Sequence, residues 1–170
     1  METSSVQFLK KSFLLLAGAI ALAGCAPKEA WQPVAIKDDS AAEHVRYFGD
    51  AAKEPGIAWR PSGLGIRILA PGAGDAPKSS DVVRVQYVGR LKDGTVFDDS
   101  HKSGGPVDFP VSHLIIGWSV AMQAMHPGGK AEFYIPPALG YGAMQAGQIP
   151  PNSGLIFEVE LIAINPPDAK

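Results

Sequence analysis

The sequence predicts an α+β domain in which an antiparallel sheet of about five strands packs on one short helix. Apolar residues alternate with polar ones in several short runs, which is typical of strands with one buried face. Glycine (19 residues) and proline (15 residues) gather in the turns between these runs. One run has the spacing of an amphipathic helix. Strands joined by tight turns pair antiparallel, and a helix can cover the buried face of such a sheet.

Length and composition exclude several classes of protein. The 170 residues suffice for one domain with an ordinary core plus extra segments. Fifteen basic and 17 acidic residues give a net charge of −2, without the basic block of a nucleic-acid-binding protein. The single cysteine excludes an internal disulfide and a thiolate metal cluster, and the scattered histidines lack metal-ligand spacing. We therefore expect neither a metal nor another cofactor, and no nucleic-acid partner.

Residues 1–24 have the features of an export signal. Two lysines precede an apolar run over 13–23, which is shorter than the ~20 residues of a membrane-spanning helix. Leu-Ala-Gly-Cys then resembles a bacterial lipobox, which implies cleavage before Cys25 and its acylation, for example with palmitate. An ordinary signal peptide with a chance cysteine is the alternative. By analogy with Gram-negative lipoproteins, Ala26 favours a lipid-anchored protein on the periplasmic side of the outer membrane.

Residues 25–62 are mixed, polar and rich in alanine, and we interpret them as a tether. A short helix over 40–52 is an option within this tract, with Ser40 as N-cap and Glu43 at the capping-box position. The tract is too short for a second globular domain. The domain itself is predicted over 63–166, followed by a tail over 167–170.

Alternation assigns the side chains of the predicted strands to two faces. It directs Tyr87 and Phe157 to the buried face, and it directs Glu132 and Tyr134 to the opposite face. Asp93-Gly94 predicts a hairpin turn. The predicted strands cover residues 66–69, 82–91, 96–98, 107–111, 131–135 and 155–162.

The predicted helix carries its apolar residues in one stripe. Trp118, Ala121, Met122 and Met125 fall at i, i+3, i+4 and i+7. The Pro-Gly-Gly stretch at 127–129 ends the helix within three turns. A large aromatic residue in the first turn of a lone short helix is either core or the floor of a pocket, and the helical pattern leaves both open.

The sequence lacks a glycine-rich phosphate loop, a His-x-x-x-His pair and a Gly-x-Ser-x-Gly elbow. It does place aromatic residues at inward positions of separate elements, which form either a core or an apolar ligand pocket. Asp98 at the end of a strand and Tyr141 in a glycine-flanked loop would supply polar groups. The aromatic residues are Tyr87, Phe97, Trp118 and Phe157.

Four stretches together resemble a known family. They read Val-Gln-Tyr-Val-Gly-Arg-Leu-Lys-Asp-Gly-Thr-Val-Phe-Asp-Asp-Ser at 85–100, Leu-Ile-Ile-Gly-Trp at 114–118, Ile-Pro-Pro-x-Leu-Gly-Tyr-Gly at 135–142 and Ile-Pro-Pro-Asn-Ser-x-Leu-Ile-Phe-Glu-Val-Glu-Leu at 149–161. In this order they resemble the FKBP-type peptidyl-prolyl cis-trans isomerases. The resemblance implies a five-stranded twisted sheet wrapped around one short helix. It also implies isomerase activity on proline-containing segments of unfolded or exported proteins, and macrolides as inhibitors.

The resemblance further implies roles for single residues. Trp118 would support the proline ring, Asp98 would be the pocket carboxylate, and Tyr141 would hydrogen-bond a substrate carbonyl. Val107 stands where eukaryotic members often have a pocket aromatic residue, and Ser103 stands where an arginine often partners the aspartate. The remaining residues implied to line the pocket are Tyr87, Phe97, Leu114, Ile115, Ile149 and Phe157.

Two other functions fit the same residues. A periplasmic holdase-type chaperone or peptide-binding module would use the pocket to hold segments without turnover, and a structural envelope lipoprotein would carry a degenerate domain.

The tract before the domain is similar to the segment that leads into the domain of macrophage infectivity potentiator-like proteins. The long dimerisation helix of those proteins has no room here, so we expect a monomer.

Overall fold

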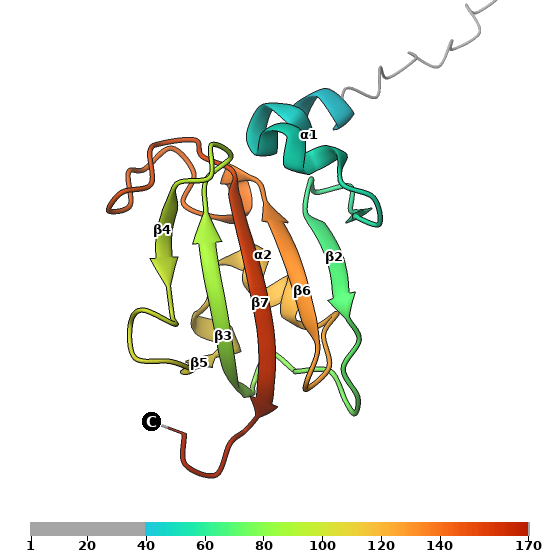
Figure 1. Cartoon of the computed structure of the whole chain (residues 1–170), viewed down its shortest axis with the longest axis vertical. Helices are drawn as coiled ribbons and strands as arrows, with labels where there is room; N and C mark the ends of the chain where they lie inside the picture. The colour runs from blue at the N-terminus through green and yellow to red at the C-terminus, as the bar shows by residue number, and fades with distance from the viewer. Residues whose placement is uncertain (1–39, 170) are drawn as a thin grey trace, which may run out of the picture. The chain divides into compact units, whose positions relative to one another are not determined.

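One antiparallel sheet and a short helix make up most of the described part of the chain, residues 40–169 of a computed structural model (Figure 1). The predicted export signal and Cys25 lie outside the described residues. The helices are α1 (Ser40–Phe48) and α2 (Ile116–Met122), with 3₁₀ helices η1 (Gly49–Lys53), η2 (Val111–His113) and η3 (Pro137–Leu139). The strands are β1 (Ala58–Trp59), β2 (Gly65–Ala70), β3 (Val82–Arg90), β4 (Val96–Asp99), β5 (Val107–Pro110), β6 (Lys130–Ile135) and β7 (Leu155–Ile164).

The strands form a single sheet in the order β1-β2-β6-β7-β3-β4, and β5 also pairs with β3. β4 pairs with residues 88–90 of β3 and β5 with residues 82–85, so the two follow each other along one edge. The predicted α+β class is therefore confirmed. Strands β2 to β7 lie at the six predicted runs, and the unpredicted two-residue β1 brings the sheet to seven strands. The sheet exceeds the five strands that the resemblance implies because β4 and β5 are separate strands on one edge and β1 is added.

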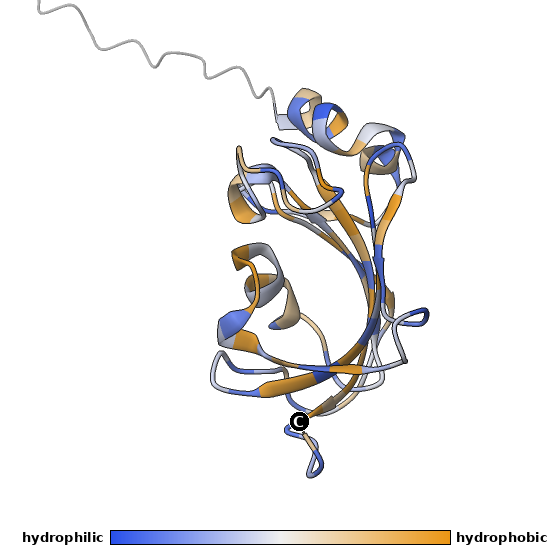
Figure 2. Ribbon diagram, turned by 90° about the vertical axis from the view of Figure 1, so that its left-hand side faces the viewer, coloured by the Kyte–Doolittle hydropathy of each residue, from blue (hydrophilic) through white to orange (hydrophobic). Residues whose placement is uncertain are grey.

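The sheet curves around α2 (Figure 2). Buried apolar side chains of the sheet and of α2 form one core cluster. In β3, Val83, Val85 and Tyr87 are buried and alternate with half-buried residues, as the sequence pattern predicts. The apolar stripe of the predicted helix is buried as well, although α2 ends at Met122 and Met125 lies beyond it. Gly117 allows α2 to approach β6, because a Cβ at this position would lie 2.5 Å from Cγ2 of Ile135.

The convex face of β6 departs from the prediction of a one-sided strand. Glu132 and Tyr134 are only 5% and 0% exposed. The Glu132 carboxylate accepts hydrogen bonds from Nη2 of Arg67 at 2.6 Å, from Nη2 of Arg90 at 3.0 Å and from the Tyr134 hydroxyl at 2.7 Å. These donors allow the charge to be buried. Alternation identified the face of the strand but not what covers it.

Helix α1 belongs to the domain, so the prediction of a tether is wrong for residues 40–62. Phe48 is fully buried against side chains of β6 and β7. The ring of His44 stacks on Trp59 with centroids 3.6 Å apart. The described residues 40–169 all belong to one compact unit. Apolar contacts with the convex face stabilise this packing, and the alanine-rich composition did not indicate them.

The helix predicted over 40–52 is present as α1 followed by η1. Ser40 is its first helical residue, so the prediction of Ser40 as the N-cap is wrong. None of the helices in residues 40–169 is both long and apolar enough to cross a bilayer.

Candidate active site

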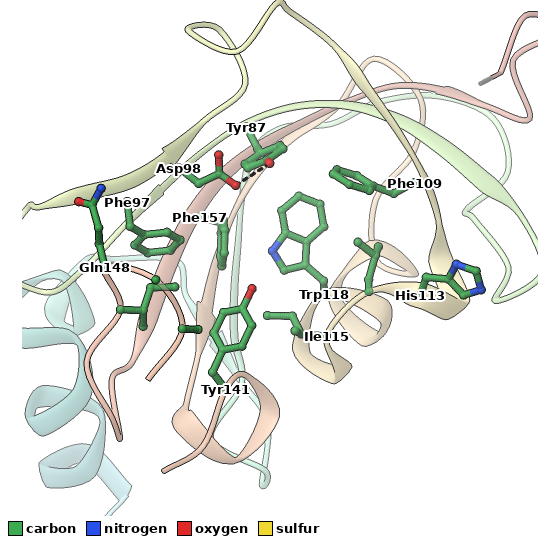
Figure 3. Close-up of a pocket in the computed structure, with 14 residues that line it drawn as sticks. Tyr87, Phe97, Asp98, Phe109, His113, Ile115, Trp118, Tyr141, Gln148 and Phe157 are labelled. Atoms are coloured by element: carbon green, nitrogen blue, oxygen red, sulfur yellow. Dashed lines mark hydrogen bonds between the residues drawn. The ribbon is translucent and has the colours of Figure 1, made fainter. Parts of the chain in front are cut away.

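A pocket of about 530 Å³ opens between α2, the concave face of the sheet and the loop that follows η3 (Figure 3). It combines side chains from segments far apart in the sequence. The lining residues are Tyr87, Phe97, Asp98, Phe109, His113, Leu114, Ile115, Trp118, Tyr141, Ala146, Gly147, Gln148, Ile149 and Phe157. Every residue predicted for the site is among them except Val107.

Trp118 in the first turn of α2 forms the floor of the pocket. It is 4% exposed, and other rings meet it edge to face. The centroid distances from Trp118 are 5.4 Å to Tyr87, 5.7 Å to Phe133 and 5.2 Å to Phe157. Edge-to-face contacts are favourable and fix the orientation of each ring. The indole is therefore held rigidly and belongs to both the core and the pocket.

One wall of the pocket depends on a glycine in the middle of a strand. Phe97 of β4 contacts Phe157 of β7 edge to face at 5.4 Å. Gly89 of β3 pairs with Phe157 in the sheet. A Cβ at Gly89 would lie 2.6 Å from the Phe97 ring and 2.8 Å from the Phe157 ring. A glycine in a strand interior often marks such a close approach, and here it leaves space for two aromatic walls.

A tyrosine–aspartate pair lies beside the floor (Figure 3). The Tyr87 hydroxyl donates a hydrogen bond to Oδ2 of Asp98 at 2.7 Å. Burial raises the pKa of Tyr87 above its ordinary value, and the hydrogen bond to Asp98 raises it further, so the phenol stays protonated as a donor. Asp98 itself is exposed at the pocket edge. No lysine or arginine is among the described residues that line the pocket.

The loop after η3 closes the pocket opposite the tyrosine–aspartate pair. Tyr141 is 37% exposed, and its hydroxyl is directed into the pocket (Figure 3). Ile149 is 6% exposed. Ala146 and Ile149 exchange two backbone hydrogen bonds of 3.1 and 2.9 Å, which fold the loop back on itself. The loop thus presents an apolar side chain and one hydroxyl to a ligand.

Val107 does not line the pocket, so the prediction for this residue is wrong. Phe109 takes its place, two residues further along β5 on the same face. The position of Phe109 is nearer to α2, and its ring centroid lies 6.5 Å from Trp118 and 6.1 Å from Tyr87. Val107 instead borders a separate hollow beside Arg84. The period-two pattern placed Phe109 on the correct face and could have identified it.

Sequence reasoning also missed polar residues at the ends of the pocket. His113 of η2 and Gln148 of the loop line opposite ends (Figure 3). Neither has an apolar periodicity that would assign it to a face, so only the folded chain identifies them.

The pocket suits the binding of a small apolar ring, with polar groups of the protein around its edge. Its lining contains no serine, cysteine or lysine that could act as a nucleophile. No group of three or more metal-ligating side chains occurs among residues 40–169. The pocket therefore combines an apolar cavity with a carboxylate and two tyrosine hydroxyls, and with the imidazole of His113 and the amide of Gln148 at its ends.

Comparisons with known proteins point to one family. A family model described as FKBP-type peptidyl-prolyl cis-trans isomerase matches residues 74–162. The chain is 43% identical over 140 residues to a probable FKBP-type peptidyl-prolyl cis-trans isomerase of Haemophilus influenzae, covering 79% of this chain and 58% of that protein. It is 48% identical over 125 residues to the FKBP-type 22 kDa peptidyl-prolyl cis-trans isomerase of Escherichia coli, covering 73% and 61%. The chain therefore spans about three fifths of these curated relatives.

Solved structures give the same result. The crystal structure of FkpA from Escherichia coli superposes with a TM-score of 0.68 at 41% identity, covering 75% of this chain and 60% of that one. A peptidyl-prolyl cis-trans isomerase from Pseudomonas syringae superposes with a TM-score of 0.65 at 34% identity, covering 79% of this chain and all of that one.

Proposed function

The chain belongs to the family of FKBP-type peptidyl-prolyl cis-trans isomerases, and we propose that it is an active isomerase whose aromatic pocket binds proline. The observation that carries this proposal is the pocket itself. Its floor is the rigid indole of Trp118, its walls are aromatic, and Asp98 and Tyr141 stand at its edge. The substrates we propose are proline-containing segments of unfolded or exported proteins.

The proposed mechanism uses binding without covalent chemistry. Rotation about an amide costs about 18–20 kcal/mol, and isomerisation before proline takes tens to hundreds of seconds. The planar amide is more dipolar than the twisted one, so the twisted amide loses less on leaving water. A dry aromatic pocket therefore favours the transition state. An acceleration of about 10⁴ requires only about 5.5 kcal/mol.

The polar groups orient the substrate in this scheme. Tyr141 can donate a hydrogen bond to a substrate carbonyl from the loop side. Asp98, held by Tyr87, faces the twisting amide from the opposite side. Hydrogen bonds that are aligned in advance with the transition state contribute to its stabilisation at little reorganisation cost.

A protease-coupled isomerase assay on proline tetrapeptides tests the proposal. We expect the mature chain to accelerate isomerisation, and Phe97→Ala or Asp98→Val to lower kcat/KM about tenfold or more while the protein stays folded. Leu69→Ala is the matched control, because Leu69 is exposed on β2 and does not line the pocket. Wild-type protein that gives only the uncatalysed rate would refute the proposal. A panel that varies the residue before proline would then define the preference.

A second activity, holding unfolded segments, is favoured by apolar side chains near the pocket. Ile116 is 60% exposed directly after the lining residue Ile115, and Met144 is 71% exposed in the loop that closes the pocket. Such residues can bind apolar segments beyond the proline. Suppression of aggregation that survives Phe97→Ala would indicate a chaperone surface separate from the pocket.

For the N-terminal segment we propose a lipoprotein anchored through Cys25 in the bacterial envelope, on the periplasmic side of the outer membrane. The support is the lysine-flanked apolar run and the Leu-Ala-Gly-Cys sequence. Labelled palmitate should enter the wild type but not Cys25→Ser, and the variant should leave the membrane fraction. Labelling of Cys25→Ser would contradict the proposal.

We further propose that the mature protein is a monomer and that macrolides compete with peptides for the pocket. Sedimentation that reveals a stable dimer would contradict the first statement. Peptide turnover that is unaffected by a saturating macrolide would contradict the second.

A further inference from the structure

One serine occupies the gap between the two strands on the outer edge of β3. β4 pairs with residues 88–90 and β5 with residues 82–85, so neither strand pairs with Tyr87. Ser100, the first residue after β4, lies at this gap and is only 1% exposed. A buried hydroxyl needs hydrogen-bond partners, and here they are all on Tyr87.

Ser100 binds both backbone groups of Tyr87. Its Oγ accepts a hydrogen bond from the Tyr87 N–H at 2.9 Å and donates one to the Tyr87 carbonyl at 3.2 Å. The Ser100 N–H donates to the same carbonyl at 3.0 Å. The Ser100 carbonyl accepts hydrogen bonds from the N–H groups of Ser103 and Gly105 at 3.1 and 2.9 Å. Ser100 therefore joins the loop after β4 to the backbone of Tyr87.

The same serine is connected to both partners of the pocket hydrogen bond. Asp98 precedes Ser100 by two residues, and the Tyr87 hydroxyl donates to Asp98. We propose that Ser100 is a positioning residue, which aligns Tyr87 and Asp98 for the transition state by holding the Tyr87 backbone. This inference rests on the proposed isomerase function. Small displacements of positioned groups have large effects on rate.

A double-mutant cycle tests the proposal. Ser100→Ala should lower kcat about tenfold with little change in KM, because the apolar walls that bind the proline ring remain. In the Tyr87→Phe background the same substitution should change kcat less than about twofold, since the hydroxyl through which Ser100 acts is absent. Amide hydrogen exchange should show lost protection of the Tyr87 N–H in Ser100→Ala.

Two further substitutions separate hydrogen bonding from packing. Ser100→Cys fills the site with a slightly larger group that is only a weak hydrogen-bonding group, so it should behave like Ser100→Ala. Ser100→Thr keeps the hydroxyl and should retain more activity than either. Ser100→Cys also serves as the test variant if Ser100→Ala folds poorly.

Ser153→Ala is the matched control, because its hydroxyl also binds a backbone carbonyl, that of Pro150 at 2.8 Å, but does not line the pocket. Ile66→Val controls for lowered stability in the core of β2. Two results would overturn the proposal if the wild type is active. One is an unchanged kcat in both Ser100→Ala and Ser100→Cys. The other is full additivity of the effects of Ser100→Ala and Tyr87→Phe on kcat. A wild type without catalysis would instead refute the isomerase function.

Discussion

Each face of the sheet carries a tyrosine whose hydroxyl donates to a carboxylate, but the surroundings of the two pairs differ. On the convex face, Tyr134 donates to Glu132 at 2.7 Å. On the concave face, Tyr87 donates to Asp98, also at 2.7 Å. The pKa of both tyrosines is raised, mainly by burial and to a smaller extent by the hydrogen bond to the carboxylate. The local geometry of the pairs is thus nearly the same.

The difference lies in the remaining partners of each carboxylate. Glu132 is 5% exposed and also binds Arg67 and Arg90, with α1 packed nearby. Asp98 is exposed beside an open pocket, and no ion pair with it occurs among residues 40–169. A carboxylate whose partners are complete stabilises the fold, whereas one that keeps free acceptor positions beside a cavity is available to a ligand.

The largest effect we expect is on the convex face. Phe48→Ala should lower the free energy of unfolding by about 3–5 kcal/mol, because it removes a fully buried ring and leaves a cavity. Activity per folded molecule should not change, since Phe48 contacts the face opposite the pocket. Urea denaturation and the isomerase assay measure the two quantities. A loss of activity in Phe48→Ala that parallels the loss of stability would contradict the assignment of a structural role to the convex face and a functional role to the concave face.

Matched neutral substitutions of the two carboxylates should have opposite outcomes. Glu132→Gln should cost about 2–3 kcal/mol of stability, because two partly buried arginines lose their charged partner, and should leave kcat/KM unchanged. Asp98→Asn should cost less than about 0.5 kcal/mol, because Asp98 is exposed, and should lower kcat/KM about tenfold. Equal losses of stability in both variants would contradict the comparison.

The smallest effect we expect is a dependence of stability on acid pH. Burial raises the pKa of Glu132, but hydrogen bonds from Tyr134, Arg90 and Arg67 outweigh it, so the pKa lies below its ordinary value of 4.5. A lowered pKa contributes stability above the unfolded-state pKa, and this stability is lost as the pH falls through the folded-state pKa. Urea midpoints from about pH 6 to about pH 3 should therefore fall less steeply in Glu132→Gln than in the wild type. Identical slopes would contradict this role of Glu132.

Several elements could be predicted because their signals are local. Alternation in β3 and β7 placed Tyr87 and Phe157 on the concave face, and the i, i+3, i+4, i+7 stripe located α2 with Trp118 at its start. Periodicity assigned Tyr87 and Phe157 only to the buried face of the sheet. The resemblance to the FKBP-type family then predicted that they line one pocket together with Trp118. Phe109 was missed although its position in β5 carried the same alternating signal as Val107.

The amino-acid pattern was enough to place strands β2 to β7, to assign their side chains to faces, and to locate the turns and the short helix α2. These properties follow from periodicity and from the backbone preferences of glycine and proline, which act over a few residues. Three features became visible only in the folded chain: α1 covers the convex face, Glu132 is buried with two arginines, and Ser100 binds the backbone of Tyr87. These contacts join residues distant in sequence or separated by turns. A local pattern assigns a side chain to a face but cannot say which other segment packs against it.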